Sequence, residues 1–78
     1  MNPQRGMSRE DCDALRHDLE AAGVAIVRVE EPSPGVFWLV YHSDMLRVDY
    51  TVTDAALFRT VVAAGMVAGL PRLTFPGP

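Results

Sequence analysis

The first regular pattern along the chain is a narrow apolar stripe between Ser8 and Gly23. Its members follow one another at spacings of three and four residues, which is the period of one face of an α-helix. The stripe consists of Cys12, Leu15, Leu19 and Ala22. Ser8 is a preferred N-cap residue, and helices commonly end at a glycine such as Gly23. The pattern therefore predicts a helix from about Arg9 to Ala22.

Three stretches rich in β-branched and aromatic residues come next, as is typical of strands. They are Val24–Glu30, Val36–His42 and Met45–Val52. The segment 31–35 contains two prolines, which cannot donate to a strand ladder, so we expect a loop there. A further apolar segment predicts a second helix from about Asp54 to Ala68.

This order of elements predicts an α+β fold of the αβββα type. Because the connections between the strands are short, we expect a three-stranded antiparallel meander with both helices packed on one face. A chain of 78 residues is long enough for one small domain. We place this domain at residues 8–70, after a flexible lead at 1–7 and before an extended proline-rich tail at 71–78.

A two-residue turn at Ser43–Asp44 would fix which residues share a face of the sheet. Apolar and aromatic residues would then meet under the helices, in the pairs Tyr41–Leu46, Leu39–Val48, Phe37–Tyr50, Val29–Phe37, Val27–Leu39 and Ala25–Tyr41. The opposite, outer face would hold the pairs His42–Met45, Val40–Arg47, Trp38–Asp49, Arg28–Trp38, Ile26–Val40 and Val24–His42.

The outer face is the first candidate interaction surface. It sets a tryptophan and two arginines beside an apolar strip, which is the composition of a protein interface. Its candidate residues are Ile26, Arg28, Trp38, Val40, His42, Arg47 and Asp49. The arginine stems could instead shield Trp38 with no partner involved, or the tail could fold over the strip through Leu73 and Phe75.

The second helix is the other candidate surface, because it is apolar nearly all round. Within the segment 55–70 only Arg59 and Thr60 are polar, and we expect Arg59 to point to solvent. Leu57 and Val61 lie on one apolar side. The next side contains glycines that would let another backbone approach closely, and we assign the interface to it. Its residues are Phe58, Val62, Gly65 and Gly69, and Met66, which lies just beyond them, is a further candidate. Alternatively, the first helix and the tail cover this surplus apolar surface.

Composition and charge exclude several classes of protein. The chain has 10 acidic and 7 basic residues, a formal net charge of −3 and no lysine, so it lacks the basic stripe that nucleic-acid binding needs. A single cysteine, Cys12, excludes an internal disulfide. No apolar run approaches the ~18 residues of a membrane span, and the N-terminus lacks the apolar core of a signal peptide. We therefore expect a cytoplasmic protein with no membrane contact.

No catalytic, cofactor or metal site is predicted. Asp13 and His17 share a helix face, but two ligands do not make a zinc site. Cys12 has no nearby base in the sequence, and the consecutive residues 42–44 (His-Ser-Asp) cannot converge as a catalytic triad. We therefore expect neither enzyme activity nor a cofactor.

The element order αβββα resembles that of double-stranded-RNA-binding domains and of HicA-type toxin ribonucleases. These families use basic residues near the start of the second helix, or a histidine in a Gly-Ser-His context. Here that helix begins Thr53-Asp54-Ala55-Ala56, and His42 is followed by a serine rather than preceded by one. The resemblance is one of element order, and no site residue is carried over from it.

The sequence thus predicts a non-enzymatic protein–protein interaction module of the small acidic adaptor or inhibitor type. Its surplus apolar surface predicts a homodimer, with another protein as a further possible partner. Two alternatives stay open. One is a nucleic-acid-associated αβββα module, which the scattered arginines disfavour. The other is a small-ligand binder around Trp38 and His42, although a three-stranded sheet seldom forms a pocket alone.

Overall fold

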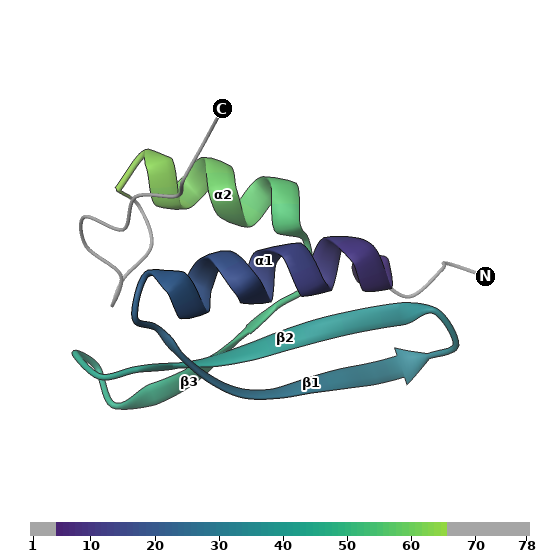
Figure 1. Cartoon of the computed structure of the whole chain (residues 1–78), viewed down its shortest axis with the longest axis horizontal. Helices are drawn as coiled ribbons and strands as arrows, with labels where there is room; N and C mark the ends of the chain where they lie inside the picture. The colour runs from purple at the N-terminus through teal and green to yellow at the C-terminus, as the bar shows by residue number, and fades with distance from the viewer. Residues whose placement is uncertain (1–4, 66–78) are drawn as a thin grey trace.

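The computed structural model describes residues 5–65 and contains two helices and one sheet (Figure 1). The elements are α1 (Arg9–Ala21), β1 (Ala25–Ser33), β2 (Val36–Ser43), β3 (Val48–Val52) and α2 (Ala55–Ala63). The strands are antiparallel in the order β1-β2-β3, and both helices lie on the same side of the sheet. The predicted α+β fold with αβββα order is confirmed. Neither helix within residues 5–65 is long and apolar enough to cross a membrane.

The hydrophobic core lies between the central strand β2 and the two helices. Both leucines of the α1 stripe are fully buried, and the ring of Phe58 in α2 lies 5.7 Å from the ring of Tyr41 in β2. The core cluster consists of Met7, Cys12, Leu15, Leu19, Leu39, Tyr41, Val52, Phe58 and Val62. Every element of the domain except β1 places a buried residue in this cluster, so the core links all the other elements.

Helix α1 begins and ends where the sequence predicts. The hydroxyl of Ser8 accepts a hydrogen bond from the backbone N–H of Asp11 at 3.1 Å. At the other end the N–H of Gly23 donates to Glu20, and the N–H of Val24 donates to Leu19. These two bonds are those of the Schellman motif, which satisfies the last helical carbonyls. The motif also returns Val24 to the core, where it packs beside the buried stripe.

Met7, the last residue of the expected flexible lead, belongs to the packed unit, whereas residues 1–4 of that lead lie outside the described residues. Met7 exchanges two backbone hydrogen bonds of 2.9 Å with Phe37, and its side chain is buried. Because β1 pairs with one edge of β2, Met7 lies along the opposite edge, the one with which β3 pairs. A Cβ atom at Gly6 would collide with Cγ1 of Val36, so a larger residue there would require the Val36 side chain to move. The sequence did not predict this pairing, because a single apolar residue such as Met7 does not form a periodic pattern.

The turn between β2 and β3 is longer than predicted. It covers residues 44–47, and Tyr41 therefore pairs with Tyr50 rather than with Leu46. Arg47 adopts a positive φ of 58°, and its N–H donates to the carbonyl of Ser43 to close the turn. Since the shift along β3 is an even number of residues, each residue from Val48 to Val52 keeps its predicted face.

Strand β1 departs from the prediction more seriously, because an extra residue interrupts its pairing. Val27 is inserted between the pairs Ile26–Tyr41 and Arg28–Val40. Such a bulge reverses the faces of the residues on one side of it. Ile26 therefore packs against the core, and the prediction that it lies on the outer face was wrong.

The end of β1 also differs from the expected loop at 31–35. The strand continues to Ser33 and turns at Pro34–Gly35, where the carboxylate of Glu31 accepts from the N–H of Gly35 at 3.0 Å. A second irregularity, between Glu30 and Ser33, contains Pro32. A proline is compatible with an edge strand at such a place because no ladder bond is needed from it.

Helix α2 is shorter than predicted and ends at Ala63. Gly65 has a φ of +70°, and its N–H donates to the carbonyl of Val62 at 2.9 Å, as expected for the residue after a helix C-cap. The expected helix as far as Ala68 was wrong because this left-handed residue stops it first. Apart from the chain next to Gly65 itself, no atom of residues 5–65 lies within 4 Å of where a Cβ of Gly65 would stand, so the expected close contact is not found in this part of the chain.

We predict that Gly65→Ala lowers the free energy of unfolding by about 1 kcal/mol, because an L-residue with a side chain is strained in the left-handed region. Gly65→Asn should lose less, since asparagine tolerates that conformation. Thermal unfolding of both variants distinguishes this strain from crowding. Crowding would make the larger asparagine worse than alanine, and that order of stabilities would contradict the observed helix end.

An ion pair joins the two helices. Nη1 of Arg59 lies 2.7 Å from Oδ2 of Asp18, and the two side chains are 33% and 19% exposed. Arg59 therefore does not point freely to solvent as expected. By contrast, the pair between Arg16 and Glu20 lies on the surface of α1 alone, with both side chains about half exposed.

Arg59→Ala should lower the free energy of unfolding by about 1 kcal/mol, because it leaves the partly buried Asp18 without this charged partner. Arg16→Ala is the matched control and should lose only a few tenths of a kcal/mol. Chemical denaturation of the two variants measures both values. Equal losses would show that the contact between the helices adds nothing beyond an exposed pair.

Candidate functional site

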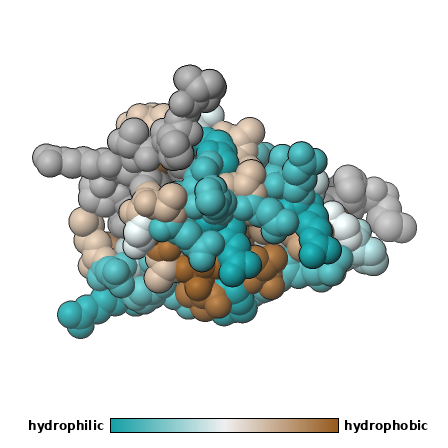
Figure 2. Space-filling view, in the orientation of Figure 1, coloured by the Kyte–Doolittle hydropathy of each residue, from teal (hydrophilic) through white to brown (hydrophobic). Residues whose placement is uncertain are grey.

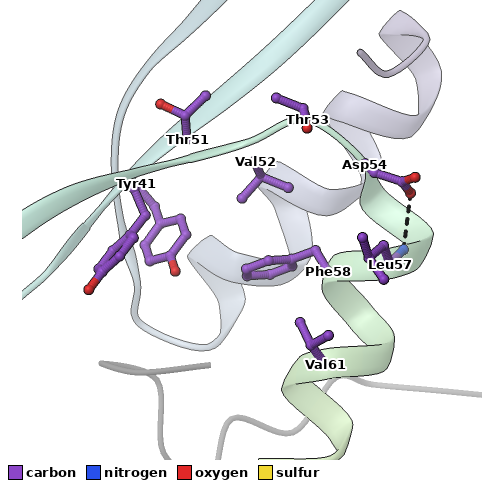
Figure 3. A pocket seen from close by; sticks show the side chains of 9 residues that line it. Tyr41, Thr51, Val52, Thr53, Asp54, Leu57, Phe58 and Val61 are labelled. Atoms are coloured by element: carbon purple, nitrogen blue, oxygen red, sulfur yellow. Dashed lines mark hydrogen bonds between the residues drawn. The ribbon is translucent and has the colours of Figure 1, made fainter. Parts of the chain in front are cut away.

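An apolar groove lies between β3 and α2, on the face of the sheet that carries the helices (Figure 3). Its volume is about 290 Å³. In Figure 3 Val52 points from β3 toward α2, whereas Thr51 points to the opposite side of the strand. The described lining residues are Tyr41, Tyr50, Thr51, Val52, Thr53, Asp54, Leu57, Phe58 and Val61.

The walls of the groove are aromatic and aliphatic. The rings of Tyr41 and Tyr50 stack at 5.6 Å, and Leu57 leaves 54% of its surface exposed at the rim. Burial of an exposed leucine and of neighbouring aromatic rings by a partner would stabilise the complex, because it removes apolar surface from water. The groove thus has the apolar character of an interface centre.

The polar groups of the groove are already satisfied or neutral. Of the described lining residues only Asp54 carries a charge, and its Oδ1 accepts from the N–H of Leu57 at 3.0 Å as the N-cap of α2. Burial, with a smaller contribution from Tyr50, raises the pKa of Tyr41 to about 12, so its hydroxyl is neutral at physiological pH. The lining therefore offers packing rather than acid–base chemistry.

The groove is bordered by an open strand edge. Among residues 5–65, β3 pairs on one side only, with β2. The N–H and C=O of Phe37 both bond to Met7, which lies on the same side of β2 as β3. Because backbone groups alternate in direction along a regular strand, the N–H and C=O of Tyr41 also point to that side, toward Tyr50. The backbone groups of Asp49 and Thr51 must then point outward. They form the donors and acceptors of an unpaired edge.

The outer face of the sheet, the first surface indicated by the sequence, is internally paired. Arg28 bonds to Glu30 at 2.7 Å, and Nδ1 of His42 lies 2.8 Å from Asp49. The indole N–H of Trp38 donates to the backbone carbonyl of Arg5 at 2.6 Å.

Val40 is buried on the same outer face, with 1% of its surface exposed. It stands between Arg28 and Thr51 in the sheet. Five of the predicted outer-face residues thus lie on that face. Their main polar groups are engaged within the fold, which makes the face a weaker candidate than the groove.

The remaining predicted interface residues are dispersed. Arg47 lies in the β2–β3 turn, and Gly65 follows the end of α2. Phe58 and Val62 are buried in the core with exposures of 8% and 4%, although Phe58 also lines the groove. Met66 and Gly69 lie outside the described residues.

Sequence reasoning missed the groove residues because it assigned the candidate interface to the side of the second helix that carries Phe58 and Val62, which the structure buries in the core. Leu57 and Val61 are recognisable in the sequence as an apolar side, but only the orientation of α2 shows that Phe58 and Val62 face inward. Tyr50 was assigned to the core face. Nothing in the sequence shows that this face stays open beside the last strand.

A second group of apolar side chains is exposed on β1. Figure 2 shows hydrophobic residues gathered over this strand, below α1. Val27 and Val29 are 42% and 38% exposed. A hollow of about 350 Å³ near Val29 is lined by charged as well as apolar residues, so it lacks the continuous apolar wall of the groove. Its charged residues are Arg9, Asp13, Arg16 and Glu31.

The single thiol is buried and chemically quiet. Cys12 is 1% exposed, and burial raises the pKa of its thiol, with the Asp13 carboxylate adding to the shift and Arg16 opposing it. Within residues 5–65 no three His, Cys, Asp or Glu side chains gather closely enough to hold a metal ion. The thiol of Cys12 is thus not held in its reactive thiolate form.

We therefore expect the native protein to react with a thiol reagent at least ~100-fold more slowly than the denatured protein, because only the exposed thiolate is a nucleophile. A colour assay for free thiol at neutral pH, with and without denaturant, measures the ratio. Labelling at equal rates in both states would show that the pocket around Cys12 opens readily.

Comparison of the chain with protein-family models, with curated proteins and with solved structures found no match in any of the three.

Proposed function

We propose that this chain is a non-enzymatic protein–protein interaction module that forms a homodimer through the groove between β3 and α2. The observation that carries the proposal is the coincidence of an apolar groove with an open strand edge. Each feature alone is common on protein surfaces. Together they supply both the apolar area and the backbone hydrogen bonds by which strands associate.

The charge distribution supports a second acidic copy at this site. The chain has a net charge of −3, so two copies repel each other over most orientations. Around the groove the described lining is neutral apart from Asp54, whose carboxylate is held at the start of α2. The groove is thus a place where two copies can approach with little repulsion.

A small apolar ligand is the second candidate, favoured by the stacked tyrosines and by the volume of about 290 Å³. That volume lies just below the range of roughly 300–1,000 Å³ that ligand sites have. The exposed rim at Leu57 also leaves one wall of the groove short. We therefore rank a protein partner above a ligand.

The test is the mass in solution of the wild type and of two matched variants. At ~100 µM the wild type should show twice the 8.5 kDa of one chain, since oligomers populate by mass action. Leu57→Lys should weaken the dimer at least tenfold, because it places a charge at the apolar rim.

Met45→Lys is the control, because Met45 is also exposed, at 63%, but lies on the β2–β3 turn outside the groove lining. It should leave the dimer unchanged. A wild type that stays at 8.5 kDa at this concentration would falsify the homodimer. Equal effects of the two lysines would remove the groove from the interface.

A further inference from the structure

We propose that the second copy adds its own β3 to the open edge of β3, antiparallel and around a two-fold axis at Tyr50, so that one sheet continues across the dimer. This inference rests on the proposed homodimer and specifies its geometry. An exposed groove could be covered in many ways. The backbone of β3 restricts the choice.

The two edges of the sheet differ in their readiness to pair. β1 carries two irregularities in its register, one of them containing Pro32, and exposes the ion pair of Arg28 with Glu30. Bulges, prolines and charges are the devices by which edge strands avoid pairing. β3 is regular from Val48 to Val52 and contains no proline. The protected edge is therefore β1, and the open edge is β3.

The outward backbone groups fix the possible registers. Asp49 and Thr51 present their N–H and C=O groups to the open edge, so in an antiparallel pair these residues must form the hydrogen-bonded positions. A two-fold axis at Asp49 would place two carboxylates opposite each other, which is unfavourable. An axis at Thr51 would place Val48 opposite Asp54 of the second copy.

An axis at Tyr50 avoids both conflicts. Asp49 then faces Thr51 of the second copy, and Val48 faces Val52 of the second copy. On the helix-bearing face the pairs are all apolar or aromatic, with the two Tyr50 rings at the centre. This self-complementarity is what a symmetric interface between identical copies requires.

The same arrangement covers the groove. Side chains of an added strand alternate between the two faces of the sheet, so those on the helix-bearing side project toward the exposed rim at Leu57. Val48 is 45% exposed and Leu57 is 54% exposed in the single chain. Both would be shielded by the second copy, whereas Trp38 on the outer face would not.

Amide hydrogen exchange of the wild-type protein tests the strand pairing without any mutation. In a single chain the N–H groups of Asp49 and Thr51 point to solvent and should exchange quickly. At concentrations where the dimer forms they should exchange at least ~10-fold more slowly, since paired amides are protected. The outward N–H of Val29 on β1 is the internal control and should exchange quickly at every concentration.

A pair of proline variants gives an independent test. Thr51→Pro removes one outward donor of β3 and no bond to β2, and should raise the dissociation constant at least tenfold with the fold retained. Val29→Pro makes the same change on β1 and should leave the dimer intact. Circular dichroism checks the fold, and light scattering checks the mass.

The outcomes separate the two proposals. If the wild type is a dimer but the amides of Asp49 and Thr51 exchange quickly, the strand pairing is overturned and the homodimer stands. If Val29→Pro alone dissociates the dimer, β1 is the paired edge. If the wild type is a monomer, the homodimer fails and the strand pairing fails with it.

Discussion

Strand β2 is the element on which the rest of the structure depends. Leu39, Val40 and Tyr41 are fully buried, and the strand hydrogen-bonds to β1 on one side and to β3 and Met7 on the other. The α1 stripe and Phe58 of α2 pack on its helix-bearing face. Because both edges and the inner face of β2 are in contact with other elements, only the neighbouring strands have a backbone edge that could pair with another molecule. A sheet this small necessarily ends in two edge strands, and the treatment of those edges decides how the molecule can associate.

Local signals in the sequence predicted much of the fold. Helix α1 was placed to within one residue, because a serine N-cap and a glycine stop bracket its apolar stripe. The faces of β3 were also correct although its register was wrong. A longer turn moved the pairing by an even number of residues, and the alternation of side chains survives such a shift. A repeating pattern of apolar residues therefore predicts the face of a residue reliably, whereas the sequence does not predict the length of a turn.

The errors arose where a single residue decides the outcome. The sequence of β1 does not show that Val27 is an extra residue, yet that insertion sends Ile26 to the core. Gly65 was compatible with a helix interior and with a helix end, and the apolar run beyond it favoured the longer helix. The candidate site was missed for a related reason. Tertiary packing alone determines which of the two apolar sides of α2 faces the sheet, and it leaves Leu57 beside the open edge.

The central claim is that this molecule associates through β3 and α2 and not through the outer face of its sheet. A dilution series of amide spectra by nuclear magnetic resonance tests it residue by residue. The account predicts concentration-dependent shifts at Asp49, Thr51, Leu57 and Val61, with Arg28 and Trp38 unchanged. Shifts that cluster at Arg28 and Trp38, or spectra that do not change between dilute and concentrated samples, would contradict it.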